Sequence, residues 1–172
     1  MCIRDSDNIL GFGDTSLEEE IGKLLIKQEK TLSTAESCSG GYLAHKIVSV
    51  PGASEYFQGS IVAYQYEMKH KLLGVSEEVL AKFGEEREEC VFEKAKGICS
   101  ELDANYAIAT SGIAGTLGGT EDKPVGTVWI AYGTKDTIKT KKLRFFRDRI
   151  RNIEATATFA MILFWKYLKE VK

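Results

Sequence analysis

A serine stands at the junction between a predicted strand and a predicted helix. Residues 31–35 (Thr-Leu-Ser-Thr-Ala) are short, alternating and β-branched, which is typical of a strand, and Glu36-Ser-Cys-Ser-Gly-Gly41 follows. A hydroxyl held at such a turn can attack a carbonyl group, because the glycines allow close approach and the amides at a helix N-terminus stabilise a developing anion. Ser37 is therefore a candidate nucleophile. The alternative is a helix cap followed by a turn.

A nucleophilic serine needs a base that takes its proton. His45 is eight residues farther along the same predicted helix, about 12 Å away at 1.5 Å per residue, which is too far for direct transfer. His70 stays open as a candidate. Lys69 is another, because a lysine desolvated in a pocket has a lowered pKa and can act as a base, with Tyr64 as a relay or orienting group. The alternative for Lys69 is a solvated charge in a loop.

Two further segments are suited to binding an anionic ligand. Residues 110–128 form a long glycine-rich connection after a predicted strand, where α/β sheets bind ligands and backbone amides can cradle an anion. This segment matches neither of the two common nucleotide-binding glycine motifs, and a flexible connector is the alternative. Residues 146–151 (Phe-Arg-Asp-Arg-Ile-Arg) begin the last predicted helix, where an arginine can bind a phosphate or carboxylate through two parallel hydrogen bonds. A solvated basic patch is the alternative there.

The elements that must position these residues alternate between helix and strand. Ser16 and Glu19 have the spacing of a capping box, and apolar residues then recur at helical intervals. The predicted helices cover about residues 16–29, 42–50, 67–73, 76–83, 86–101 and 150–170. The predicted strands cover about residues 31–35, 60–64, 105–110, 126–132 and 137–146, the last two joined by a turn at Gly133. This order predicts a layered α/β domain with a mixed sheet.

Length, charge and cysteine usage narrow the class of protein. The 172 residues suit one domain over residues 14–172, preceded by a loose tail over residues 1–13. A formal charge of −2 argues against nucleic-acid binding, which needs a basic surplus. The four cysteines lack zinc-like spacing, so we expect reduced thiols, no metal site and a cytoplasmic location. No apolar stretch approaches the roughly 20 residues of a membrane span, and no signal peptide is visible, so we expect no membrane partner.

Taken together, the motifs resemble those of the CinA C-terminal domain family, whose stand-alone members are nicotinamide-nucleotide amidases. The resemblance covers about residues 16–168. Its two most specific segments are Ala35-Glu-Ser-Cys-Ser-Gly-Gly41 and the run from Ser111-Gly-Ile-Ala-Gly115 to Lys123-Pro-Val-Gly-Thr-Val128. The other matching residues are Val62, Ala63, Tyr64, Glu67, Lys69, residues 72–75, residues 118–120, Asp148 and Arg149.

The resemblance implies a three-layer α/β/α sandwich with a mixed sheet, often seen as a homodimer. It implies hydrolysis of the carboxamide of nicotinamide mononucleotide to nicotinate mononucleotide and ammonia, without a metal or cofactor. Ser37 corresponds to the nucleophile, Lys69 to the general base and Tyr64 to its partner. Backbone amides near Gly40 and Gly41 would receive the oxyanion. The implied substrate-binding residues are Glu36, Gly40, Gly41, Thr110, Ser111, Gly112, Gly115 and Arg149.

Several positions depart from the family pattern. They are Ser39, Gln65, Tyr66, Met68, Thr116, Arg147 and residues 84–89. Residues 84–89 carry charges where the family has a Gly-Ala-Val-Ser turn, and the changes at 65, 66 and 68 touch the segment that bears Lys69. The sequence also leaves open whether Arg149 or Arg151 faces the pocket. Two other functions therefore stay open: a nucleotide-binding or regulatory module without turnover, and an amidase for a related amide.

Overall fold

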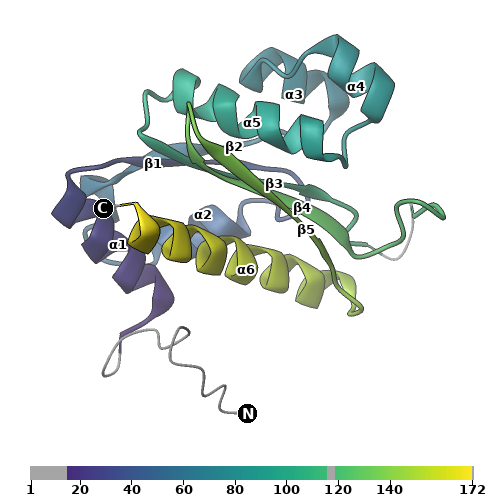
Figure 1. The fold of residues 1–172 in the computed structure, drawn as a ribbon. Coiled ribbons are helices and arrows are strands. Elements are labelled where there is room, and N and C mark those ends of the chain that lie inside the picture. The colour runs from purple at the N-terminus through teal and green to yellow at the C-terminus, as the bar shows by residue number, and fades with distance from the viewer. Residues whose placement is uncertain (1–14, 116–118, 172) are drawn as a thin grey trace.

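The computed structural model describes residues 15–115 and 119–171, and the predicted tail over residues 1–13 lies outside these ranges. One sheet has five strands in the order β2-β1-β3-β4-β5, with helices on both faces (Figure 1). The strands are β1 (Leu32–Glu36), β2 (Phe57–Val62), β3 (Tyr106–Gly112), β4 (Thr127–Thr134) and β5 (Ile138–Arg144). The helices are α1 (Leu17–Gln28), α2 (Tyr42–Val48), α3 (Tyr66–Leu73), α4 (Glu77–Phe83), α5 (Glu88–Glu101) and α6 (Arg149–Glu170), with a short 3-10 helix at Ala53–Glu55. The predicted α/β class with a mixed sheet is confirmed.

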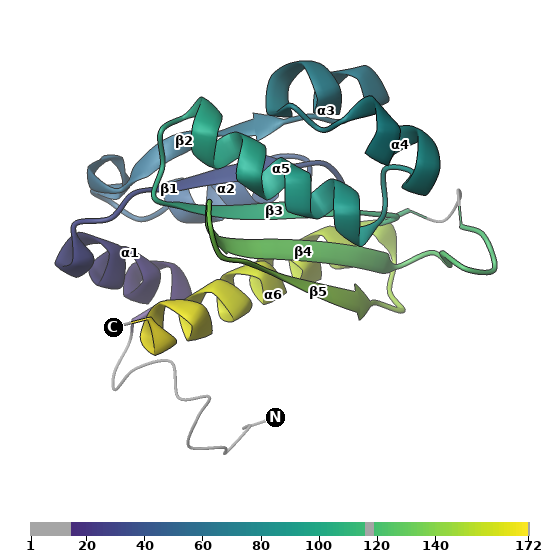
Figure 2. The same ribbon diagram turned by 45° about the horizontal axis from the view of Figure 1, so that its top comes forward.

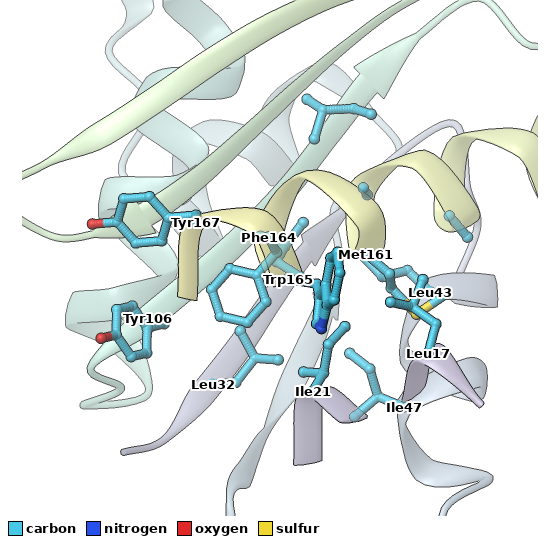
Figure 3. Close-up of a cluster of buried hydrophobic side chains, with 14 of the residues drawn as sticks. Leu17, Ile21, Leu32, Leu43, Ile47, Tyr106, Met161, Phe164, Trp165 and Tyr167 are labelled. Atoms are coloured by element: carbon cyan, nitrogen blue, oxygen red, sulfur yellow. The ribbon is translucent and has the colours of Figure 1, made fainter. Parts of the chain in front are cut away.

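Two groups of helices enclose the sheet. Helices α1, α2 and α6 cover one face, and α3, α4 and α5 cover the other (Figure 1, Figure 2). On the α6 side, apolar side chains of α1, β1 and α6 meet in one cluster (Figure 3). Within it, the ring of Tyr106 stands edge-on to Phe164, with centroids 5.6 Å apart. Burying such large side chains supplies most of the favourable free energy of folding.

Helix α6 carries an apolar stripe along one face. Ala157, Ala160, Met161 and Phe164 are buried, and Ile153 is half-buried. A stripe of this kind packs one face of a helix against a sheet and leaves the other face in water. Among the residues that the structure describes, no helix is both long and apolar enough to span a membrane.

All predicted helices and strands occur in the described ranges, with bounds shifted by a few residues. Strand β2 begins at Phe57, three residues before the predicted start, because its pairing with β1 begins at Leu32 opposite Phe57. The turn predicted at Gly133 is wrong, since Gly133 lies within β4 and pairs with Ile138. The reversal comes after it, where Thr134 and Thr137 exchange backbone hydrogen bonds. The capping box of Ser16 and Glu19 at the start of α1 is confirmed.

Strand directions bring four distant segments to one edge of the sheet. Strands β2, β1 and β3 are parallel, so the residues that follow them emerge at the same edge. Strand β4 is antiparallel to β3 and begins at that edge, and β5 ends there. Figure 2 shows the segment after β3 and the N-terminal end of α6 at this common edge. The candidate residues of all four segments therefore meet there.

Candidate active site

A buried carboxylate shapes the turn that follows β1. Glu36 is fully buried, and its carboxylate accepts hydrogen bonds from the backbone N–H groups of Gly41, Leu43 and Ala44 at 2.8–3.2 Å. It therefore caps the first turn of α2, whose N-cap residue is a glycine without a side-chain acceptor. The predicted substrate-binding role of Glu36 is not supported by this position, because its carboxylate is already occupied by the helix. Its effect is to hold Ser37 in place at the end of the strand.

The backbone amides expected to receive the oxyanion are already engaged. The N–H of Gly40 donates to the carbonyl oxygen of Ser37 at 3.0 Å, and that of Gly41 donates to Glu36 at 2.9 Å. Neither of these two N–H groups is free in this structure to receive an oxyanion. The N–H of Cys38 forms no hydrogen bond to any residue that the structure describes, and Cys38 borders the candidate pocket.

A pocket of about 290 Å³ opens at this edge of the sheet. It collects residues from the ends of β1, β2 and β3 and from the start of α6. The predicted site residues that line it are Ser37, Tyr64, Ser111, Gly112, Gly115 and Arg149. The predicted residues outside the lining are Glu36, Gly40, Gly41, Lys69 and Thr110. Ser37 is 8% exposed, so its hydroxyl is sheltered but reachable from the pocket.

Arg149, rather than Arg151, faces the pocket. Its guanidinium donates to the phenol oxygen of Tyr64 at 3.0 Å and passes directly over Gly115. Asp148 is the N-cap residue of α6 and accepts a hydrogen bond from the backbone N–H of Arg151 at 3.0 Å, so the helix begins at Arg149. The side chain of Arg151 pairs with Asp148 and is 70% exposed. The alternative that the sequence leaves open is therefore resolved in favour of Arg149.

Lys69 lies directly behind the pocket wall. It is fully buried on α3, and its Nζ donates to the carbonyl oxygen of Tyr64 at 2.7 Å and to the carboxylate of Glu85. Both of these partners line the pocket. Among the described residues, Lys69 Nζ makes no hydrogen bond to Ser37. Lys69 therefore does not line the pocket itself but is hydrogen-bonded to two residues that do. One of them, Glu85, belongs to the acidic loop between α4 and α5.

A second buried lysine lies near Lys69. Lys94 on α5 is fully buried, and its Nζ donates to the carbonyl oxygen of Thr110 at 2.7 Å. Burial lowers the pKa of Lys94 to about 8, with the charge of Lys69 acting in the same direction and Glu36 opposing it. Thr110 itself is buried, and its hydroxyl contacts that of Ser39 at 2.7 Å. Lys94 therefore anchors the end of β3 at Thr110, the residue before Ser111 of the pocket lining.

The two histidines lie outside the pocket lining. His45 is exposed on α2 beside the ring of Tyr42. His70 is exposed on α3, and its Nδ1 lies 2.8 Å from the carbonyl oxygen of Val75. Neither ring borders the pocket in which Ser37 lies. In the ranges that the structure describes, no group of three His, Cys, Asp or Glu side chains is arranged to hold a metal ion.

Sequence reasoning missed part of the lining. The additional lining residues are Cys38, Gln65, Glu85, Glu86, Ile113 and Ala114. The signal for two of them was the charged run over residues 84–89, which departs from the family pattern. Two kinds of contact fix the loop that carries Glu85 and Glu86. The hydroxyl of Ser111 donates to the carbonyl oxygen of Glu85 at 2.6 Å. Glu86 and Arg87 form ion pairs with Lys123 and Asp122, in the segment after β3.

Known proteins resemble this chain over nearly its whole length. The sequence model of the CinA C-terminal domain matches residues 14–168. CinA-like proteins from Cytophaga hutchinsonii and Amoebophilus asiaticus are 48% and 44% identical to it, covering 95% and 94% of this chain. The chain spans 39% of the length of each of these curated relatives. The crystal structure of a competence damage-inducible protein A from Klebsiella pneumoniae superposes with a TM-score of 0.88 at 32% identity, covering 91% of this chain and 97% of that one.

Proposed function

Because the chain belongs to the CinA C-terminal domain family, we propose that it is a nicotinamide-nucleotide amidase. The proposed reaction is hydrolysis of the carboxamide of nicotinamide mononucleotide to nicotinate mononucleotide and ammonia. The main support is that Ser37, Tyr64 and Arg149 line the same pocket. A sheltered hydroxyl provides a nucleophile, and a guanidinium at the mouth provides a partner for a phosphate.

The size of the pocket suits a mononucleotide. Its volume of about 290 Å³ lies just below the roughly 300–1,000 Å³ usual for small-molecule sites, as expected for a small ligand. Among the described residues, the hydrogen bond of the Arg149 guanidinium is the one to Tyr64, which leaves donors for two parallel hydrogen bonds to phosphate oxygens. We therefore place the phosphate of the substrate at Arg149 and its carboxamide at Ser37.

The proposed chemistry is acyl transfer to Ser37. Neutral Lys69 takes the hydroxyl proton as Ser37 Oγ attacks the amide carbon, and it then gives the proton to the leaving nitrogen, so that ammonia departs. Water, deprotonated by the same lysine, cleaves the resulting ester, which releases the carboxylate product and restores the serine. To act as the base, Lys69 Nζ must turn away from Glu85 and towards Ser37. Glu85 and Ser37 line the same pocket.

The backbone amide of Cys38 is the best candidate for the oxyanion donor. Cys38 directly follows the proposed nucleophile, lines the pocket and has an N–H without a partner among the described residues. In other serine hydrolases built on a strand–turn–helix, the amide after the nucleophile serves this purpose. One such donor typically contributes about 10²–10³-fold to the rate.

Ammonia release from nicotinamide mononucleotide tests the proposal. We expect Ser37→Ala to reduce turnover by at least about 10³-fold, because the nucleophile is removed, while the fold is retained. Ser49→Ala is the matched control, since Ser49 is the C-cap residue of α2 outside the pocket, and among the described residues its hydroxyl donates to the carbonyl oxygen of Lys46. Turnover close to that of the wild type in Ser37→Ala would reject the mechanism. A panel of other pyridine and ribonucleotide amides shows whether a related amide is the better substrate.

A binding or regulatory module without turnover is the second candidate. It is favoured by the contact between Lys69 and Glu85, which occupies the group that would have to act as the base. In that case nicotinamide mononucleotide raises the melting temperature, because a ligand that binds only the folded state stabilises it, but no ammonia appears. Ammonia release that disappears in Ser37→Ala would exclude this candidate.

The family resemblance also leads us to propose a homodimer. Light scattering coupled to gel filtration measures the mass of the particle directly. A mass twice that of the 19.1 kDa chain supports the dimer, and the mass of a single chain contradicts it.

A further inference from the structure

The carboxylate of Glu85 is the anionic partner of the buried Lys69 ammonium. We propose that Glu85 is an inhibitory clamp, which holds Lys69 protonated in the resting protein and must be displaced by substrate before Lys69 can accept the Ser37 proton. This inference rests on the proposed amidase function, because it assumes that Lys69 acts as a base. Glu85 lies in the charged run that departs from the family pattern, so the clamp would be a property of this chain.

Both described partners of Lys69 Nζ are hydrogen-bond acceptors. A lysine ammonium offers three donors, and here one is bound by the carbonyl oxygen of Tyr64 and another by the Glu85 carboxylate. A fully buried ammonium is stable only when an anion or several acceptors compensate for its lost hydration. Glu85 supplies that anion, and its carboxylate occupies the Nζ group that would have to accept the Ser37 proton.

Other charged or titratable groups near Lys69 do not replace Glu85. On α5, the ammonium of Lys94 carries the same sign of charge as Lys69 and so cannot take the place of Glu85. Burial raises the pKa of the Cys90 thiol, on the same helix, to about 11, which leaves that thiol neutral. Glu86 lies beside Glu85, but its carboxylate pairs with Lys123 Nζ at 3.1 Å. Within the described residues, Glu85 is therefore the carboxylate in contact with Lys69.

The clamp can open without unfolding the loop. The side chain of Glu85 is 32% exposed and borders the pocket, so substrate can reach it. Its backbone is anchored separately, since its carbonyl oxygen accepts from the Ser111 hydroxyl and the next two residues form ion pairs with Lys123 and Asp122. Rotation of the Glu85 side chain alone would release Lys69. The cationic pyridinium ring of the proposed substrate offers the carboxylate a new partner.

A nuclear magnetic resonance titration of ¹³C-labelled lysine tests the clamp without requiring turnover. The midpoint for Lys69 is measured in the wild type, in Glu85→Gln and in Glu86→Gln. We expect Glu85→Gln to lower the midpoint by about one pH unit or more, a tenfold change in the ratio of ammonium to amine, because the adjacent negative charge is lost. Glu86→Gln removes the same charge from the same loop but should shift the midpoint much less. An unchanged midpoint in Glu85→Gln, or equal shifts in both variants, would overturn the proposal.

The pH dependence of ammonia release provides the second readout. In Glu85→Gln we expect kcat/KM at pH 7 to rise about tenfold and the acid limb of the profile to move to lower pH, since a larger fraction of Lys69 is neutral. A lower rate at every pH with an unmoved acid limb would mean that Glu85 assists catalysis, and the clamp would be rejected. If neither protein releases ammonia while the Lys69 midpoint still falls, the amidase proposal is rejected and the inhibitory role of Glu85 is rejected with it, while the electrostatic effect of Glu85 on Lys69 is supported. If ammonia is released and the midpoint does not move, the clamp alone is rejected.

Discussion

The guanidinium of Arg149 donates a hydrogen bond of 3.0 Å to the phenol oxygen of Tyr64, a residue 85 positions earlier in the chain. The contact joins the first residue of α6 to the segment between β2 and α3 at the mouth of the pocket. Tyr64 remains 53% exposed, so a ligand that enters the pocket meets both side chains. This pair therefore allows the binding role of Arg149 to be tested separately from the chemistry at Ser37.

Arg149→Lys is expected to weaken substrate binding. Lysine retains the charge but cannot form two parallel hydrogen bonds to a phosphate. We expect KM for nicotinamide mononucleotide to rise about tenfold to a hundredfold with a smaller change in kcat, as measured by steady-state ammonia release. Arg151→Lys is the matched control, because the side chain of Arg151 points outward and pairs with Asp148. Equal effects of the two variants would contradict the assignment of Arg149 to the pocket.

Gly115→Ala is expected to affect binding and not folding. An added Cβ would lie 2.6 Å from Nη1 of Arg149, which must move, and a flexible side chain can do so at low cost. At Gly112 the added Cβ would lie 2.4 Å from the carbonyl oxygen of Thr127, where backbone would have to shift. We expect the free energy of unfolding to fall by less than about 1 kcal/mol in Gly115→Ala and by about 1–3 kcal/mol in Gly112→Ala.

Urea unfolding and steady-state kinetics separate these two glycine effects. Gly115→Ala should raise KM because it displaces Arg149, while its unfolding midpoint stays near that of the wild type. An unchanged KM, or a loss of stability as large as in Gly112→Ala, would show that Arg149 does not depend on the space above Gly115.

Glu36→Gln is expected to reduce stability. The carboxylate accepts three backbone N–H groups at the start of α2, and a glutamine replaces one of its acceptor oxygens by a donor. We expect the free energy of unfolding to fall by about 1–3 kcal/mol, measured by urea titration, because a buried polar group loses its partner. Ser37→Ala is the control from the adjacent position and should unfold like the wild type. Wild-type stability combined with a raised KM in Glu36→Gln would restore the substrate-binding role expected from the sequence.

The elements of the fold could be predicted because their signals are local. The capping pair Ser16 and Glu19 starts α1, and the apolar stripe from Ala157 to Phe164 specifies the buried face of α6. The start of β2 at Phe57 could not be predicted in the same way, because the pairing with β1 decides it. Local pattern thus predicts which elements form, and tertiary pairing decides where they begin and end.

The candidate site could be predicted only in part, for the same physical reason. Residue types and spacing were sufficient to select Ser37 as a candidate nucleophile. They were also sufficient to expect an anion-binding arginine near position 149. The partner of Lys69 could not be predicted, because Glu85 reaches it from a loop 16 residues later and no periodic pattern links them. Glu36 is a different case, since the family resemblance implies a substrate-binding role, whereas its carboxylate here accepts a hydrogen bond from the start of the helix that follows.

Buried Lys94 makes the stability of the protein depend on pH in a defined direction. Its pKa of about 8 in the folded state lies below the 10.5 expected for an unfolded chain. Between these values the unfolded state binds more protons, so stability rises with pH. The cost of the buried charge is fully present below pH 8 and is relieved as the pH approaches 10.5. From about 1.4 kcal/mol per pKa unit, this cost is on the order of 3 kcal/mol.

Lys94→Met is therefore expected to stabilise the protein at pH 7. Methionine fills a similar volume without a charge, although the carbonyl oxygen of Thr110 loses its donor, so we expect a net gain of about 1–2 kcal/mol. The gain should disappear near pH 10, where Lys94 is neutral in the folded wild type. Urea unfolding of the wild type and Lys94→Met at pH 7 and at pH 10 measures the difference in their free energies of unfolding. The other lysines are common to both proteins, so their contributions cancel in this difference. A loss of stability of the same size at both pH values would mean that the hydrogen bond to Thr110 outweighs the burial of the charge.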